Sequence, residues 1–283
     1  MSPPGGPTRL STLLGDHPVT RALRRGQVTS ARVALDFADV RVPHTAFKRV
    51  VRDLAFDVAE LALMTFLLAR EFGRPLRLLP AVVTARFQHP LIVYDAARGP
   101  LRPADLAGRR VGLRSYPVTT ATWIRAILAD DYGVDLARVR WVTFEEAHVA
   151  GFREPPTVER APAGAELVPM LLAGELDAAI VGEPPADPRL RPLIPDPAAA
   201  AAAWRRRTGA IQVNHMVVVR ASLPPALSEE VYRMLAESRA AAGDPDMAPF
   251  GLPANRRNLE VAVDCAYRQG LISRRFAVEE LVA

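Results

Sequence analysis

The stretch GRRVGLRSYPVTTATWIRAIL, residues 108–128, decides how the fold is interpreted. Residues 110–113 form a short apolar run that predicts a buried strand, and 121–128 have the periodicity of an amphipathic helix. Between them lies a polar loop, and Thr119 and Thr120 are residue types that commonly cap helices. Free backbone N–H groups and the helix dipole make such a connection suitable for an anion, although most such connections bind nothing. We therefore expect either a carboxylate-binding loop or an ordinary connection of an α/β domain.

Strand and helix patterns alternate on both sides of this stretch, which favours mostly parallel sheets covered by helices. The expected strands are 9–14, 31–37, 55–58, 76–83, 91–94, 110–113, 139–142, 178–181 and 217–220. The expected helices are 18–25, 43–52, 60–72, 121–128, 166–173, 198–203, 227–242, 254–269 and 278–281. Asp196 is the expected N-cap of the alanine-rich helix, with Pro197 at its first position.

Two apolar strands, 91–94 and 217–220, each follow a polar stretch that contains a histidine. The economical arrangement is two α/β lobes joined by these two crossover strands. Carboxyl ends of strands from both lobes would then face one interlobe cleft, where ligands of open α/β sheets bind. The expected parts are a disordered tail at 1–8, lobe one at 9–88 and 216–283, and lobe two at 89–215.

The composition is that of an ordinary globular protein, with 283 residues, 49% hydrophobic and 24% charged. The net charge of +5 comes almost entirely from arginine, because Lys48 is the only lysine, and the bases are scattered rather than gathered on one helix. We therefore expect no nucleic-acid partner. No segment is apolar enough for a signal peptide or a membrane span, so we expect a cytoplasmic protein without a membrane partner. Cys265 is the sole cysteine and is expected to be a small buried residue.

Chemistry-bearing residues gather where the predicted strands end. Asp16 and His17 follow the first strand, as an exposed turn or as groups that bind a ligand. Glu60 opens an expected apolar helix, either as a cap stabilised by the helix dipole or as a group that orients a ligand hydroxyl or takes its proton. Arg86 and His89 precede the first crossover, and His215 precedes the second. Arginine binds carboxylates through two parallel hydrogen bonds, and histidine titrates near neutral pH.

Further candidates line the predicted loops. Trp123 would stack on an aromatic ligand or, as is commoner, lie in the core. Glu183 follows a strand of lobe two and would reach the cleft or form a turn. The expected binding set is His17, Arg86, Arg114, Ser115, Tyr116, Thr119, Thr120, Trp123 and Glu183. The sequence has no GxxxxGK[ST], GxGxxG after the first strand, GxSxG or HExxH, and Glu145, Glu146 and His148 match no strong metal pattern. We therefore expect no metal and no cofactor.

Several segments, in order over almost the whole chain, resemble the 4,5-dihydroxyphthalate decarboxylase family. They are GD-x4-RAL at 15–23, RDLAFDVAEL at 52–61, RFQHPLIV at 86–93, DLAGRRVGLRSYPVTTATWIRAIL at 105–128, YGVDLARVRWV at 132–142, RRTG at 206–209, NHMVVVR at 214–220 and PFGLPANRRNLEVAV…QGL…FAVEEL at 249–281. The resemblance implies the two-lobed fold of type II periplasmic substrate-binding proteins, used as a cytoplasmic enzyme. The chain departs from the family in three respects: Ala59, Ala62, Leu63 and Met64 make apolar a segment that is usually serine-rich, His17 stands where the family often has tyrosine, and the segments around 144–158 and after Arg239 are shortened or altered.

The resemblance further implies non-oxidative, cofactor-independent decarboxylation of a hydroxylated, phthalate-like aromatic acid. The arginine and histidine positions suit an aromatic or enolic acid more generally. Ser115, Thr119, Thr120 and Arg86 would hold the carboxylate that is retained. His89 or His215 would be the acid that protonates the ring carbon, and Glu60 or Asp16 would be the base or the orienting group. Two alternatives stay open, a solute-binding protein for a small organic acid and another lyase or dehydratase on the same fold. The chain would act alone or as a homodimer.

Overall fold

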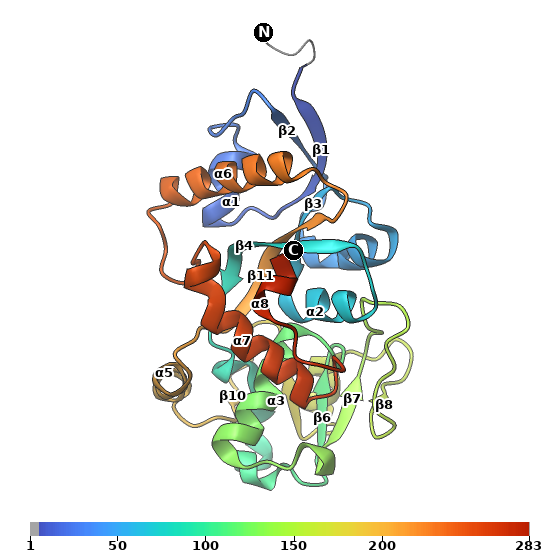
Figure 1. The fold of residues 1–283 in the computed structure, drawn as a ribbon. Coiled ribbons are helices and arrows are strands. Elements are labelled where there is room, and N and C mark those ends of the chain that lie inside the picture. The colour runs from blue at the N-terminus through green and yellow to red at the C-terminus, as the bar shows by residue number, and fades with distance from the viewer. Residues whose placement is uncertain (1–5, 283) are drawn as a thin grey trace. The chain divides into compact units, whose positions relative to one another are not determined.

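The computed structural model describes residues 6–282 of the chain, drawn as a ribbon in Figure 1. Contacts divide the chain into two units, each with a sheet of its own. The first unit holds the residues up to Arg86 together with those from Val213 onward, and the second unit is Phe87–Gln212. Of the predicted tail, residues 1–5 lie outside the described residues, and the first strand begins at Thr8.

The described part of the first unit contains a five-stranded sheet in the order β2-β1-β3-β11-β4. Its strands are β1 (Thr8–Leu13), β2 (Val33–Phe37), β3 (Val58–Ala62), β4 (Leu76–Ala85) and β11 (Val213–Arg220). β1 runs parallel to β2 and β3, whereas β11 lies antiparallel between β3 and β4. The strand that enters from the distant part of the chain is thus the one that breaks the parallel order.

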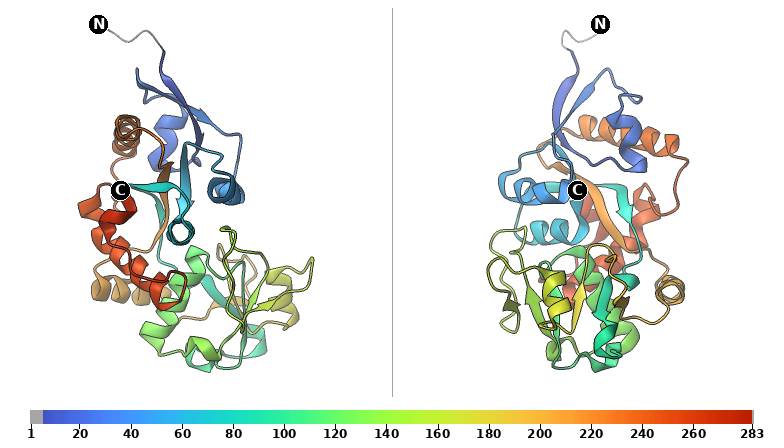
Figure 2. Two further views of the ribbon diagram at one scale, coloured as in Figure 1. Left: turned by 45° about the vertical axis from the view of Figure 1, so that its right-hand side comes forward. Right: turned by 180° about the vertical axis from the view of Figure 1, so that it is seen from behind.

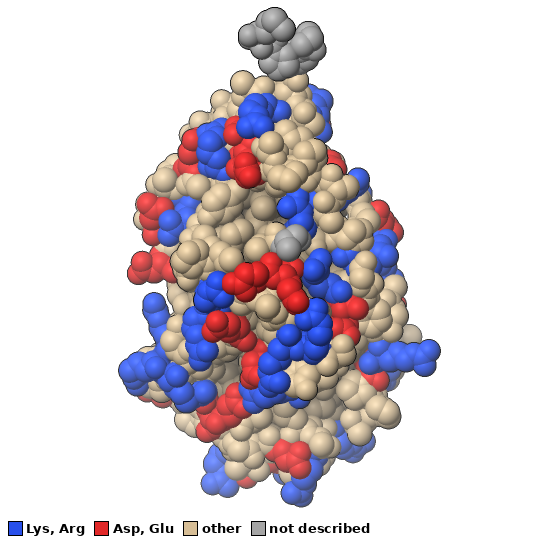
Figure 3. Space-filling view, in the orientation of Figure 1, with Lys and Arg blue, Asp and Glu red and all other residues tan. Residues whose placement is uncertain are grey.

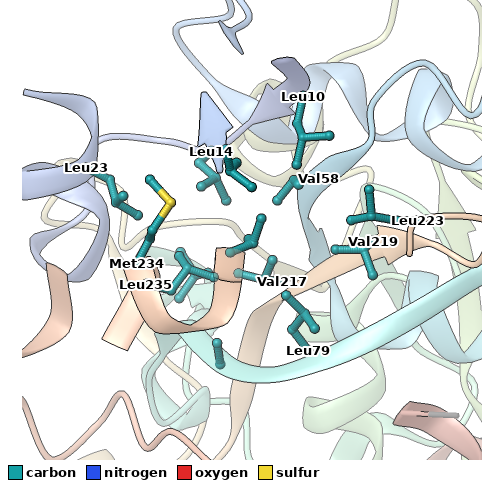
Figure 4. Close-up of a cluster of buried hydrophobic side chains, with 14 residues drawn as sticks. Leu10, Leu14, Leu23, Val58, Leu79, Val217, Val219, Leu223, Met234 and Leu235 are labelled. Atoms are coloured by element: carbon teal, nitrogen blue, oxygen red, sulfur yellow. The ribbon is translucent and has the colours of Figure 1, made fainter. Parts of the chain in front are cut away.

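Helices of the first unit are α1 (Pro18–Arg24), α2 (Leu63–Glu71), α6 (Pro225–Ala241), α7 (Leu252–Arg268) and α8 (Val278–Val282). α1 and α6 pack side by side, and their apolar faces meet the sheet in a cluster that includes Leu23, Val58, Val217, Met234 and Leu235 (Figure 4). Removing a buried leucine side chain from such a cluster costs roughly 2–5 kcal/mol of unfolding free energy. This packing fixes β3 and β11 beside each other.

The described part of the second unit contains a six-stranded sheet in the order β10-β5-β9-β6-β7-β8. Its strands are β5 (Ile92–Asp95), β6 (Arg110–Leu113), β7 (Arg140–Thr143), β8 (Glu159–Arg160), β9 (Ala178–Ile180) and β10 (Leu190–Pro192). Its helices are α3 (Thr119–Tyr132), α4 (Leu167–Ala173) and α5 (Pro197–Thr208), seen from two further directions in Figure 2. β5 is antiparallel to both of its neighbours, and the other strands share one direction. The carboxyl ends of β6, β7 and β9 therefore lie along one edge.

The structure corrects several predicted elements. The expected helix 60–72 begins only at Leu63, and Glu60 lies in β3 rather than at a helix N-terminus. All five residues of β3 are buried between β1 and β11, and a fully apolar run does not distinguish a buried strand from a buried helix. The expected helix 43–52 is a 3₁₀ turn, η1 (Pro43–Ala46), followed by a π-helical turn, η2 (Arg49–Asp53). The short edge strands β8 and β10 were not predicted.

The helix caps agree with prediction at one helix and differ at another. Asp196 caps α5 as expected, because its carboxylate accepts a hydrogen bond from the N–H of Ala199 at 3.0 Å. At α3 the N-cap residue is Val118, without a side-chain cap, so the capping role expected of Thr119 and Thr120 is wrong. Both threonines lie one position or more inside the helix.

Acidic and basic side chains are interspersed on the face shown in Figure 3. Arg275 and Arg268 both pair with Asp264 on α7, at 2.7 Å and 2.8 Å. Among residues 6–282, no helix combines the length and the apolar character needed to cross a bilayer.

Candidate functional site

Glu60 is a carboxylate on a central strand of the first sheet, and its side chain is only 1% exposed. β3 and β11 are antiparallel, and Glu60 lies opposite Val217. Residues two apart on a strand face the same side, so His215 shares the face of Val217 and of Glu60. The strand register therefore brings together two residues that are 155 positions apart in the sequence.

Three groups bind the two oxygens of Glu60. The backbone N–H of Gly15 donates to Oε2 at 2.6 Å, and His17 Nε2 lies 2.8 Å from the same oxygen. His215 Nδ1 lies 3.0 Å from Oε1. One buried carboxylate thus orients two imidazoles, each through one ring nitrogen. We call Glu60, His17 and His215 the carboxylate–histidine cluster.

The turn between β1 and α1 is shaped to bring His17 to Glu60. A Cβ on Gly15 would lie 2.6 Å from His17 Nε2 and 3.1 Å from Glu60 Oε2, so only glycine allows this approach. The hydroxyl of Thr20, fully buried on α1, donates to the carbonyl of Gly15 at 2.6 Å and accepts the backbone N–H of His17 at 3.0 Å. A single hydroxyl therefore holds both sides of the turn.

The two imidazoles are the solvent-accessible part of the carboxylate–histidine cluster. The side chains of His17 and His215 are 24% and 23% exposed, whereas Glu60 lies beneath them. The ring of His215 also packs edge-on against buried Phe47, with centroids 5.1 Å apart. The carboxylate and the phenyl ring together restrict the orientation of His215.

Electrostatics keep Glu60 ionised. Burial by itself raises the pKa of Glu60, but the hydrogen bonds from His17 and His215 and the attraction of their charge outweigh it and lower the pKa to about 2. The carboxylate is therefore charged at neutral pH and accepts a hydrogen bond from each imidazole. An anion that orients a histidine is a recurring device for proton transfer in enzymes.

His89, the other histidine expected as an acid, has a different environment. It begins the 3₁₀ turn η3 (His89–Leu91) in the second unit, is 0% exposed, and neither ring nitrogen has a hydrogen-bond partner. Burial first, and then the nearby charge of Arg207, lower the pKa of His89 to about 4. Its imidazole is therefore neutral at pH 7.

Asp16 points away from the carboxylate–histidine cluster. Its exposed carboxylate accepts a hydrogen bond from Arg21 Nε at 2.9 Å, and this contact lowers its pKa. Asp57, next to β3, accepts hydrogen bonds from the N–H and the hydroxyl of Ser11 at 2.8 Å and 2.7 Å. Both acids are thus engaged with groups other than the histidines.

The predicted carboxylate-binding loop joins β6 to α3 in the second unit. Ser115 is buried, and its hydroxyl has no hydrogen-bond partner. Tyr116 is nearly buried and lies under the guanidinium of Arg125, 3.9 Å from the ring centroid. Trp123 is fully buried and packs edge-on against Trp204 at 5.9 Å, as a core tryptophan does. Of the remaining expected binding residues, Thr119 is buried, Arg114 and Thr120 are half-buried, and Arg86 and Glu183 are exposed.

The sequence did not single out Gly15, Thr20 or Phe47 individually. A glycine before Asp16-His17, followed by threonine three residues after His17, was the available signal, because a hydroxyl at that spacing commonly closes the first turn of a helix. Within residues 6–282, no group of three His, Cys, Asp or Glu side chains is arranged to hold a metal ion.

Solved structures define the class of fold. The sulfonate-binding protein SsuA of Escherichia coli superposes with a TM-score of 0.59, covering 98% of this chain and 97% of that one at 12% identity. SsuA of Xanthomonas axonopodis gives 0.58 over 99% of both chains at 14% identity. The desulfurization enzyme DszB gives 0.56 over 97% and 96% at 15% identity. The chain thus has the two-lobed α/β fold of type II periplasmic binding proteins.

Sequence relatives give the family. No family model matches the chain. A 4,5-dihydroxyphthalate decarboxylase of Pseudomonas putida is 31% identical over 210 residues, which are 70% of this chain and 81% of the relative. One of Comamonas testosteroni is 28% identical over 256 residues, 83% of this chain and 76% of the relative. The chain belongs to the 4,5-dihydroxyphthalate decarboxylase family, whose named members are carboxy-lyases.

Proposed function

We propose that this protein is a cofactor-independent, non-oxidative decarboxylase of a hydroxylated, phthalate-like aromatic acid. Both relatives are named for a decarboxylation of dihydroxyphthalate. The observation that carries the proposal for this chain is the buried, ionised Glu60 bound to two partly exposed imidazoles. Proton transfer by a positioned imidazole is the step that such a reaction needs most.

The reaction replaces a carboxylate on the ring with a proton. A ring carbon that carries both the incoming proton and the carboxylate loses carbon dioxide readily, because the electron pair of the breaking C–C bond restores the aromatic ring. His215 is the proposed proton donor. Its Nδ1 is bound to Glu60, so Nε2 is the nitrogen left to carry the transferred proton.

Glu60 is proposed to orient His215 and to balance its positive charge. A carboxylate whose pKa is about 2 is a weak base, so it is poorly suited to remove a proton from the substrate. The alternative donor, His89, has a pKa of about 4 and carries little proton at pH 7. The low pKa of His89 and the contact of His215 with the charged Glu60 favour His215 over His89 as the acid.

Other parts of the predicted function stay predictions. They are the grip on the retained carboxylate by Ser115 and its loop, binding of the substrate in an interlobe cleft, a cytoplasmic location and a homodimer. The buried hydroxyl of Ser115, which has no partner, supports the first of them.

The direct test is to incubate the purified protein with hydroxylated benzene dicarboxylic acids and to measure carbon dioxide and the ring product. We expect release from a member with a hydroxyl para to a carboxylate, and unchanged turnover after dialysis against a chelator. Loss of turnover on dialysis would contradict cofactor independence. Tight binding of one acid without release from any would instead favour the solute-binding alternative.

The donor is tested by His215→Gln beside His89→Gln. Loss of a general acid lowers kcat by about 10²-fold to 10⁴-fold. We expect this loss for His215→Gln and a much smaller change for His89→Gln. The reverse order would assign the proton to His89.

A further inference from the structure

His17 and His215 contact different oxygens of the Glu60 carboxylate, so two imidazoles are available at one site. His17 comes from the turn before α1, and His215 comes from β11. Their side chains are almost equally exposed, at 24% and 23%. Both imidazoles therefore meet the same carboxylate and reach solvent to a similar extent.

The decarboxylation proposed above exchanges protons at two atoms of the substrate. The ring carbon must gain a proton, and the hydroxyl para to it must lose one while negative charge moves from the oxygen into the ring. Two proton carriers at separate positions suit such a substrate better than one. Glu60 cannot easily be the second carrier, because both of its oxygens already accept hydrogen bonds.

We propose that His17 is a further catalytic residue, a base that takes the proton of the substrate hydroxyl while His215 gives a proton to the ring carbon. This inference rests on the proposed function. The O–H electron pair becomes the C=O bond of a dienone, and the ring carbon gains a C–H bond. The C–C bond to the carboxylate then breaks, its electron pair restores the ring, and carbon dioxide leaves. The oxygen regains its proton from His17, and water reprotonates His215.

The charge on the carboxylate–histidine cluster stays constant through this exchange. At the start His215 carries the positive charge, and after the transfers His17 carries it. Glu60 contacts both rings, so its single negative charge balances either one at hydrogen-bond distance. During the two transfers the buried carboxylate therefore keeps a positively charged partner, whose loss would be costly, and reprotonation of His215 by water restores that partner at the end of the cycle.

The test uses hydroxyphthalates whose hydroxyl acidity is raised stepwise by ring halogens, with wild type, His17→Gln and His215→Gln. A base is needed only while the hydroxyl is protonated. We expect kcat of His17→Gln to fall by about 10²-fold or more below wild type on the least acidic substrate. The ratio of the two kcat values should approach one as the hydroxyl becomes ionised in solution. For His215→Gln the ratio of wild-type kcat to variant kcat should stay constant along the series.

Arg25→Gln, at the exposed C-terminal end of α1, is the control for a polar substitution beside the same helix that leaves the carboxylate–histidine cluster intact, and it should behave as wild type. His17→Asn serves as a second variant if His17→Gln does not fold. A ratio of wild-type kcat to His17→Gln kcat that is the same on every substrate, or full kcat of this variant, would overturn the assignment while leaving the proposed function intact. Absence of turnover in the wild type would instead overturn the proposed function.

Discussion

His215 and His89 lie at matched places in the sequence, each just before or within an apolar strand that follows a change of unit, yet their surroundings are opposite. His215 is partly exposed and bound to an ionised carboxylate at 3.0 Å. His89 is fully buried, and both of its ring nitrogens have no partner. A histidine's chemistry depends on what faces it, so two similar sequence contexts give one partly exposed ring bound to a carboxylate and one buried, neutral ring.

The largest loss of activity is expected when the charge of Glu60, which distinguishes the surroundings of His215 from those of His89, is removed. Glu60→Gln keeps the size of the side chain but removes the charge that holds both imidazoles. We expect kcat to fall by about 10²-fold to 10⁴-fold, measured as carbon dioxide release at saturating substrate. Glu230→Gln is the matched control, because Arg233 and Ser30 lower the pKa of Glu230 to about 2 as well, but on α6, away from the histidines. Equal losses in both variants would mean that the charge of Glu60 has no special role.

The second prediction concerns the other histidine and the pH dependence of stability. The pKa of His89 falls from 6.5 in the unfolded chain to about 4 in the folded one. Between these values the unfolded chain binds more protons, so His89 contributes stability that is present above pH 6.5 and is lost as the pH falls toward 4. The unfolding free energy should fall by roughly 3 kcal/mol over this pH range through His89 alone, and the fall should be smaller in His89→Phe. Urea unfolding at pH 7 and pH 4.5 measures it. An unchanged pH dependence in the variant would show that His89 is not the group responsible.

Much of the fold follows from local pattern. Residues 110–113 form the expected strand, the helix expected at 121–128 lies within α3 at 119–132, and Asp196 and Pro197 start α5 as expected. The pattern fails around Glu60, because the chain from Val58 to Ala69 is buried throughout and no alternation marks where strand becomes helix. Local propensity cannot decide that boundary. Pairing of β3 with β1 and β11 decides it.

The sequence identifies the individual residues of the site, but it does not show that they contact one another. His17, Glu60 and His215 are each recognisable as chemistry-bearing residues near the ends of strands. That they share one carboxylate depends on the register of β11 against β3, which joins positions 155 apart. Asp16 adjoins His17 in the sequence, but its carboxylate is bound to Arg21 instead of to either histidine.

A smaller effect is expected from the residue that holds the turn. Thr20→Val keeps the shape of the side chain but leaves the carbonyl of Gly15 and the N–H of His17 without their shared partner. His17 should then shift by a fraction of an ångström, and kcat should fall roughly tenfold, since a full ångström of misplacement costs about 10²-fold. Thr20→Ser retains the hydroxyl and should recover most of the rate. If serine and valine behave alike, the hydroxyl does not position His17.

The smallest effect is expected at Asp16, the acid next to His17 in sequence. Its carboxylate is 59% exposed and pairs with Arg21, and exposed ion pairs contribute little because water and salt screen them. Asp16→Asn should therefore leave kcat within about twofold of wild type. The measurement belongs beside Glu60→Gln, in the same assay and at the same pH. A large loss for Asp16→Asn would place a second carboxylate in proton transfer. The distinction between a buried anion that orients histidines and an exposed one that pairs only with Arg21 would then no longer explain this site.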